Sequence, residues 1–300
     1  MKSPKRFLLF GAWLVLAFVS APERLTAQPP ATAPSHPFWK IQGKTNAVYL
    51  LGSIHFCTGE FYPLAKPIED AYQRSKVVVF EADPAELASA AMQKKLVADG
   101  MYPAGETLSQ HVSKETYSAV KVRLEAINGQ GAALDQFKPW LAAVSLVTLE
   151  MQKLGFDPEQ DIDKHFHRRA QSDKKEIVPL ETVESQIGLL TSLSKEEEEL
   201  FLKATLRDIA RFPKIAGDMV RSWKTGDLKK LQWLLLEVMK EYPALQQKLT
   251  TNRHRAWLPK IEKLLQEEKD AFVVVGLAHL VDEGSLVDLL KKKGITVEQQ

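Results

Sequence analysis

The sequence predicts an α/β protein with a mainly parallel central sheet, flanking helices and a large helical cap. Four apolar runs, at 48–51, 77–80, 177–180 and 272–275, lack the polar alternation of a strand with one exposed face. Such continuous runs are typical of strands that are covered on both faces, as in parallel sheets. Long segments with helical spacing separate the runs, and strands that alternate with helices indicate the α/β class.

Helical spacing accounts for most of the chain between the strands. Two segments are typical helix starts, because each begins with a capping side chain: Asp83-Pro84, and Ser194 with Glu197 three residues later. The segments at 86–170 and 186–262 therefore predict two helical layers over the sheet edge. The expected helices are 106–127, 137–154, 157–171, 184–192, 195–211, 213–223, 227–239, 243–265 and 283–293.

Composition and charge narrow the class of protein. The 300 residues are 45% hydrophobic and 26% charged, which excludes a disordered chain, a collagen-like repeat and a multi-span membrane protein. Without residues 1–27, 36 of the 40 basic residues and 37 of the 38 acidic residues remain. This near-neutral balance gives no electrostatic reason to expect a nucleic-acid partner. Cys57 is the one cysteine, so a disulfide framework and a multi-cysteine zinc site are excluded.

The first 27 residues are typical of an export signal peptide. A basic start precedes the apolar run at 7–19, and small residues around Ala21 and Ala27 offer two cleavage positions. We expect this segment to be removed by signal peptidase, and its retention as an N-terminal membrane anchor is the alternative. Residues 28–37 then form a proline-rich linker, and 38–300 form the folded domain. The expected location is periplasmic or extracellular, with no membrane span after signal removal.

Each of the four apolar runs ends close to a chemically useful residue. His55, Glu81, Glu181 and His279 follow the successive runs. Ligands of open α/β sheets bind beyond the carboxyl ends of the strands. We therefore expect these four side chains to meet at one edge of the sheet.

The Gly-x-x-His element occurs twice, at 52–55 and 276–279. Glycine at a strand exit permits either a positive φ or a close backbone approach. Two neutral imidazoles with a carboxylate form a common set for a divalent cation with an open position. We expect His55 and His279 to be metal ligands, and a pair of structural histidines is the alternative.

Other candidate residues are expected to have structural roles. The helix expected after Asp157-Pro158 would make His165 and His167 diverge, so we assign both to solvated or capping positions. Cys57 lacks a nucleophile pattern and is expected to be a small hydrophobe near the site.

Several motifs together resemble the TraB/PrgY/gumN family, over about residues 38–300. They are YLLGSIH at 49–55, FYPL at 61–64, VVFEAD at 78–83, DID at 161–163 with Arg169, PLETVESQ at 179–186, TNR at 251–253 with Trp257, and VVGLAHL at 274–280. The family is similar to Tiki-type metalloproteases and more distantly to erythromycin-esterase (EreA) and ChaN-like folds. The resemblance implies an α/β core and a divalent-metal-dependent hydrolase, plausibly a peptidase, that acts on a peptide or small molecule.

This resemblance leads to a hypothesis about the site. His55 and His279 would bind Mn²⁺, Co²⁺ or Zn²⁺, with Glu81 as third ligand or general base. Glu181 would complete the shell or carry a proton to the leaving amine. Arg253 would pair with one of these acids or stabilise the oxyanion, and an exposed cation on a basic helix is the alternative.

Three points stay open at the level of sequence. Asp163 enters from the family motif alone, as a helix-start or supporting residue. A metal-free esterase-like hydrolase would use a histidine as base, oriented by the glutamates. A non-catalytic protein that sequesters a peptide or a cofactor would need neither a metal ion nor a catalytic base.

Overall fold

The computed structural model describes residues 36–55, 57, 61–127, 134–236 and 242–300. The predicted signal peptide, its cleavage positions at Ala21 and Ala27, and the linker up to residue 35 lie outside the described residues. Among the described residues, no helix has both the length and the apolar character needed to cross a membrane.

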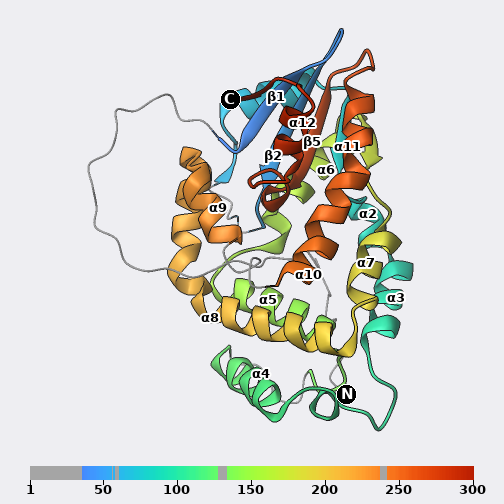
Figure 1. Cartoon of the computed structure of the whole chain (residues 1–300), viewed down its shortest axis with the longest axis vertical. Coiled ribbons are helices and arrows are strands. Elements are labelled where there is room, and N and C mark those ends of the chain that lie inside the picture. Colours follow the sequence, from blue (N-terminus) through green and yellow to red (C-terminus); the bar gives the residue numbers. More distant parts are fainter. Residues whose placement is uncertain (1–35, 56, 58–60, 128–133, 237–241) are drawn as a thin grey trace, which may run out of the picture.

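A six-stranded sheet forms the upper half of the molecule in Figure 1. The strands lie in the order β4-β3-β5-β2-β1-β6. Their bounds are β1 Phe38–Gln42, β2 Ala47–Ser53, β3 Val77–Phe80, β4 Glu176–Pro179, β5 Ala271–Gly276 and β6 Val297–Gln299.

The four predicted strands are confirmed as β2, β3, β4 and β5, which pair in parallel. The sheet as a whole is mixed, because β1 lies antiparallel to both β2 and β6. The prediction missed these two strands, since β1 returns through a short turn and β6 has three residues. Coverage on both faces also fails for β4, an edge strand whose residues are exposed or half-buried.

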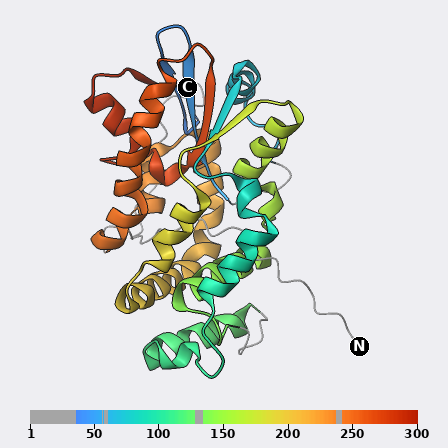
Figure 2. The same ribbon diagram turned by 90° about the vertical axis from the view of Figure 1, so that its right-hand side faces the viewer.

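Helices cover both faces of the sheet. In Figure 2, α1 and α6 lie on one side, in cyan and lime, and α11 and α12 lie on the other, in orange and red. The helices are α1 Lys66–Arg74, α2 Pro84–Leu87, α3 Ala90–Gly100, α4 Lys114–Ala126, α5 Pro139–Lys153, α6 Ile162–Ser172, α7 Val183–Thr191, α8 Lys195–Thr225, α9 Leu228–Leu236, α10 Pro243–Gln246, α11 Asn252–Leu264 and α12 Leu286–Lys292.

A helical cap with its own core lies below the sheet in Figures 1 and 2. We define the cap as α3, α4, α5, α7 and the first half of α8, which share a hydrophobic cluster separate from that of the sheet. Ala82, two residues beyond the end of β3, belongs to the cap cluster, so the cap covers the carboxyl end of this strand. Only parts of the two predicted helical layers build this cap, because α6 and α11, which lie mostly within the predicted ranges, pack in the sheet core instead.

Helix α8 joins the two cores. Phe201 and Ile209 pack in the cap core, whereas Met219 and Trp223 pack in the sheet core. The sequence predicted two helices here, with a break at Pro213, but α8 continues through the proline. The buried face of α8 extends over both cores, and its packing outweighs the hydrogen bond that a proline cannot donate.

The two Gly-x-x-His elements pack against each other through Gly52 and Leu277. Gly52 pairs with Val275 of β5, and a Cβ on Gly52 would lie 2.5 Å from Leu277 Cδ1 and 3.3 Å from Leu277 Cα. Trp223 Nε1 also donates to the Gly52 carbonyl oxygen at 2.7 Å. Close approach, rather than a positive φ, therefore explains the glycine of the first element.

Replacing Gly52 with alanine should destabilise the protein by about 1–3 kcal/mol, because the new methyl group must displace buried Leu277. Chemical denaturation of the single and double variants measures this. In the pair Gly52→Ala and Leu277→Ala, the double variant should lose less stability than the two singles combined. Gly188→Ala is the matched control, since no atom of the described residues lies within 4 Å of its Cβ position. Equal losses for Gly52→Ala and Gly188→Ala would contradict the packing argument.

Candidate functional site

Two neighbouring clusters of polar side chains lie at the carboxyl ends of the parallel strands, next to the cap. They include the residues that follow β2, β3, β4 and β5. One cluster contains His55, Asp161 and Asp163. The other contains Glu81, Glu181 and His279, which meet around Arg253. The four strand-end residues are thus divided between two clusters.

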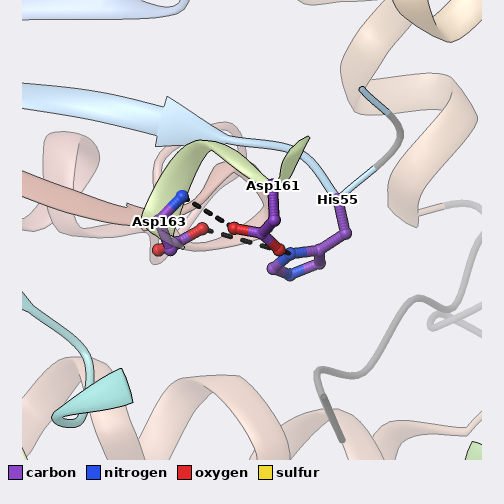
Figure 3. Close-up of side chains that lie close together, drawn as sticks. All are labelled: His55, Asp161 and Asp163. Carbon is purple, nitrogen blue, oxygen red and sulfur yellow. Dashed lines mark hydrogen bonds and ion pairs between the residues drawn. The ribbon is translucent and has the colours of Figure 1, made fainter. Parts of the chain in front are cut away.

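His55 faces two aspartates at the start of α6, as Figure 3 shows. Asp161 is the N-cap residue of α6, and its Oδ1 accepts from the backbone N–H of Asp163 at 2.7 Å. Its Oδ2 makes a very short contact with His55 Nδ1, whereas Asp163 Oδ2 lies 4.0 Å from the same nitrogen. One ligand atom from each side chain lies within 4.8 Å of the others, so the three residues can hold a cation.

Burial and charge set the protonation of this cluster. Burial disfavours the charged imidazolium of His55, but the charge and hydrogen bond of Asp161 outweigh it and raise the pKa of His55 to about 9. Burial also opposes ionisation of Asp161, yet the His55 charge lowers the pKa of this aspartate. Burial and then the Asp161 charge raise the pKa of Asp163 well above its usual value. The cluster therefore contains two acidic side chains, and the single positive charge of His55 can compensate the negative charge of only one of them.

Arg253 joins the two glutamates that end β3 and β4. Its Nη2 donates to Glu181 Oε1 at 2.6 Å and makes a very short contact with Glu81 Oε2. Gln186, in the first turns of α7, donates to Glu181 at 3.2 Å and to Glu81 at 3.4 Å. The Arg253 side chain is only 10% exposed, so the alternative of a surface cation is wrong.

The backbone around Glu81 and Arg253 explains their positions. The backbone N–H of Glu181 donates to the Glu81 carbonyl oxygen at 2.8 Å, which continues the pairing of β3 with β4. The backbone N–H of Gly276 donates to Glu81 Oε1 at 2.7 Å. Arg253 follows a π-helical turn at Gln247–Thr251, a feature that is frequent at functional sites. Burial raises the pKa of Glu181, although the Arg253 charge opposes this shift.

His279 ends the turn Leu277–His279 and contacts the same arginine. Arg253 Nη1 lies 3.1 Å from His279 Nε2, and Glu81 Oε1 lies 3.5 Å from it. Burial, then the Arg253 charge, holds the pKa of His279 well below its usual value. The nitrogen expected to bind a metal therefore faces a guanidinium, and His279 lies outside the cluster of His55.

An electrostatic contact links the two clusters. The Glu81 charge contributes to the raised pKa of His55 and, after burial and Asp161, to that of Asp163. Removal or rearrangement of Glu81 would therefore affect both clusters.

Sequence reasoning missed three residues of the site. Asp161 was part of a quoted motif but received no role, although an aspartate before a helical segment is a capping signal. Gln186 and His254 were not singled out, and His254 Nε2 lies 2.8 Å from His279 Nδ1. No local pattern marks these two residues, because their partners lie in distant parts of the chain.

The predicted solvated positions of His165 and His167 are wrong, since His167 is buried and His165 is half-buried in packed surroundings. His167 is buried and lies 3.1 Å from Asp83, the N-cap residue of α2, while His165 stacks on Tyr62 with ring centres 4.0 Å apart. Their divergence on α6 is confirmed. Cys57 is buried, its Sγ contacts the Ile54 carbonyl oxygen at 3.4 Å, and burial raises the pKa of its thiol. A thiol held in this protonated form is a poor nucleophile.

Comparison with known proteins gives the family. A protein of Treponema pallidum (strain Nichols), described as an uncharacterized protein, is 23% identical over 303 residues, which cover 93% of this chain and 88% of that protein. No solved structure matches the chain, so likeness to EreA and ChaN stays a prediction. The model of the TraB/PrgY/gumN family matches residues 37–299. With nearly all of its folded part matched, the chain belongs to the TraB/PrgY/gumN family.

Proposed function

We propose that this protein is an exported divalent-metal-dependent hydrolase that cleaves peptide bonds, with the cation held by His55, Asp161 and Asp163. The observation that carries the proposal is Asp163 Oδ2, a buried atom that accepts no hydrogen bond from any residue the structure describes. A buried carboxylate oxygen without a hydrogen-bond donor is costly, and a cation would satisfy it. One imidazole and two carboxylates suit Mn²⁺, Co²⁺ or Zn²⁺.

This ligand set differs from the one expected from the repeated motif. Both carboxylate oxygens of Glu81 already accept hydrogen bonds, from Gly276 and from Arg253. The Nε2 atom of His279 receives a donor from Arg253. We therefore assign Glu81 and His279 to the neighbouring cluster, as groups that hold Arg253, and keep His55 as the metal ligand.

The site divides the chemistry between its two clusters. When bound, the cation would polarise a carbonyl group and make a water molecule more acidic. Arg253 can donate to a carbonyl oxygen on which negative charge develops. Glu181, whose pKa is raised by burial, is suited to pass a proton to the leaving amine.

Features of the sequence support the proposed location and class of partner. The signal-like segment at 1–27 supports export to the periplasm or to the medium. A peptide or small molecule would bind where the cap meets the carboxyl ends of β2, β3 and β5. A near-neutral charge on the remaining chain supports a partner other than nucleic acid.

A metal-free esterase-like hydrolase is the second candidate. Glu81, Glu181, Arg253 and His279 form a hydrogen-bonded set that is complete without a cation. In that mechanism His279 would be the base and the glutamates would orient Arg253. Turnover that persists in chelator would favour this candidate, and saturable peptide binding without turnover would favour a sequestering protein.

Asp163→Asn should abolish stoichiometric metal binding without unfolding the protein. Wild type, reconstituted with Mn²⁺, Co²⁺ or Zn²⁺, should hold about one equivalent, and its Tm should rise because the cation binds the folded state. In chelator the variant should be at least as stable as wild type, since it removes one buried carboxylate beside Asp161. Metal-to-protein ratios from mass spectrometry and thermal scans measure both effects.

Glu159→Gln is the matched control for Asp163→Asn. Glu159 lies four residues earlier, its side chain is 54% exposed, and it pairs with Lys164. This control removes the same charge but should keep the metal. A full equivalent of metal in Asp163→Asn would contradict the assigned ligand set.

Glu181→Gln should keep metal binding but lose hydrolysis of a peptide library by about 10²-fold or more, because glutamine cannot donate or accept the transferred proton. Product analysis by mass spectrometry measures the rate with the bound ion. Glu184→Gln, an exposed position in the first turn of α7, should leave the rate unchanged. Wild-type activity in Glu181→Gln would exclude this role.

A further inference from the structure

His254, His279 and the carbonyl group of Gly284 form a chain of hydrogen bonds that ends at Arg253. We infer that His254 is a positioning residue that fixes the tautomer of His279, so that His279 presents an unprotonated Nε2 to the Arg253 cluster. The distances along the chain are 2.8 Å from Gly284 O to His254 Nδ1, 2.8 Å from His254 Nε2 to His279 Nδ1, and 3.1 Å from His279 Nε2 to Arg253 Nη1.

One end of this chain is an obligate acceptor. A backbone carbonyl oxygen can only accept, so His254 Nδ1 must carry the proton that it donates to Gly284. A neutral imidazole has one N–H, and therefore His254 Nε2 is an acceptor. His254 can then receive a hydrogen bond from His279 but cannot donate one to it.

The other end is an obligate donor. A guanidinium can only donate, so His279 Nε2 must be the acceptor for Arg253 Nη1. His279 therefore carries its proton on Nδ1, which is the atom that faces His254 Nε2. The two ends give the same assignment, and any other arrangement of protons breaks at least one of the three hydrogen bonds.

The local structure holds this chain in place and keeps it dry. His254 and His279 are 4% and 6% exposed, so water has little access to replace a lost partner. Gly284 has a φ of +77°, which favours glycine, and its backbone N–H donates to Asp288 Oδ2 at 2.7 Å. These contacts aim the Gly284 carbonyl group at His254, while Trp257 packs on His279 with ring centres 4.8 Å apart.

The fixed tautomer gives His279 a defined chemical role. With its proton on Nδ1, His279 offers an unprotonated Nε2 that holds Arg253 Nη1, so that the guanidinium is kept in position to donate to a substrate carbonyl oxygen. This use rests on the proposed hydrolytic function, whereas the tautomer itself does not. A test of the tautomer in metal-free protein therefore separates the two.

Nitrogen-15 NMR of the protein, labelled at histidine and kept in chelator, tests the inference directly. Long-range proton–nitrogen correlations distinguish a protonated ring nitrogen from an unprotonated one. In wild type, both His254 and His279 should carry the proton on Nδ1, with signals assigned through His254→Gln and His279→Gln. A proton on Nε2 of either ring would overturn the inference. The measurement is made on wild type and needs no activity, and the two variants serve only to assign the signals.

Two variants of His254 then test its positioning role. His254→Leu removes the acceptor, so His279 should lose its pure Nδ1–H form, and peptide hydrolysis should fall by about 10–100-fold, mainly in kcat. His254→Gln offers a carbonyl oxygen at a similar place and should restore both the tautomer and most of the rate. His167→Gln, a change at another buried histidine, should leave the His279 signals in place. An unchanged His279 spectrum in His254→Leu would contradict the role.

Discussion

The ion pairs that Arg253 makes with Glu81 and Glu181 hold the functional edge of the sheet together. Two glutamates that follow adjacent parallel strands must lie close to each other, and Glu81 is only 2% exposed. Loss of one partner from such a buried set typically costs about 3–5 kcal/mol, because charge remains without compensation. Arg253 comes from α11, so this interaction also ties a helix on one face of the sheet to the ends of β3 and β4.

The cluster of His55 lacks such compensation, and this contrast gives the site its chemical character. Around Arg253, each oxygen of Glu81 has a donor, and the network is complete. Around His55, one imidazole faces two buried aspartates, and Asp163 Oδ2 has no donor among the described residues. The His55 cluster can therefore hold an added cation. The neighbouring Arg253 cluster, whose hydrogen bonds are already complete, can supply hydrogen-bond donors.

Several residues of the site also have a structural task. Asp161 caps α6 with one oxygen and contacts His55 with the other. Gly52 allows Leu277 to approach closely, and Gly276 donates its backbone N–H to Glu81. The same local features that begin a helix or end a strand therefore aim the functional side chains.

The sequence by itself determined the parallel strands, the start of α8 at Ser194, and the placement of histidines and glutamates at strand ends, since periodicity and capping are local properties. It did not determine the antiparallel strands β1 and β6, which are short and lack a distinctive pattern. Only the tertiary structure decided which side chains meet. His55 contacts Asp161 across 106 residues, and Arg253 contacts Glu81 across 172 residues. Such contacts depend on the strand order and on where α6 and α11 meet the sheet, and no local signal in the chain specifies these.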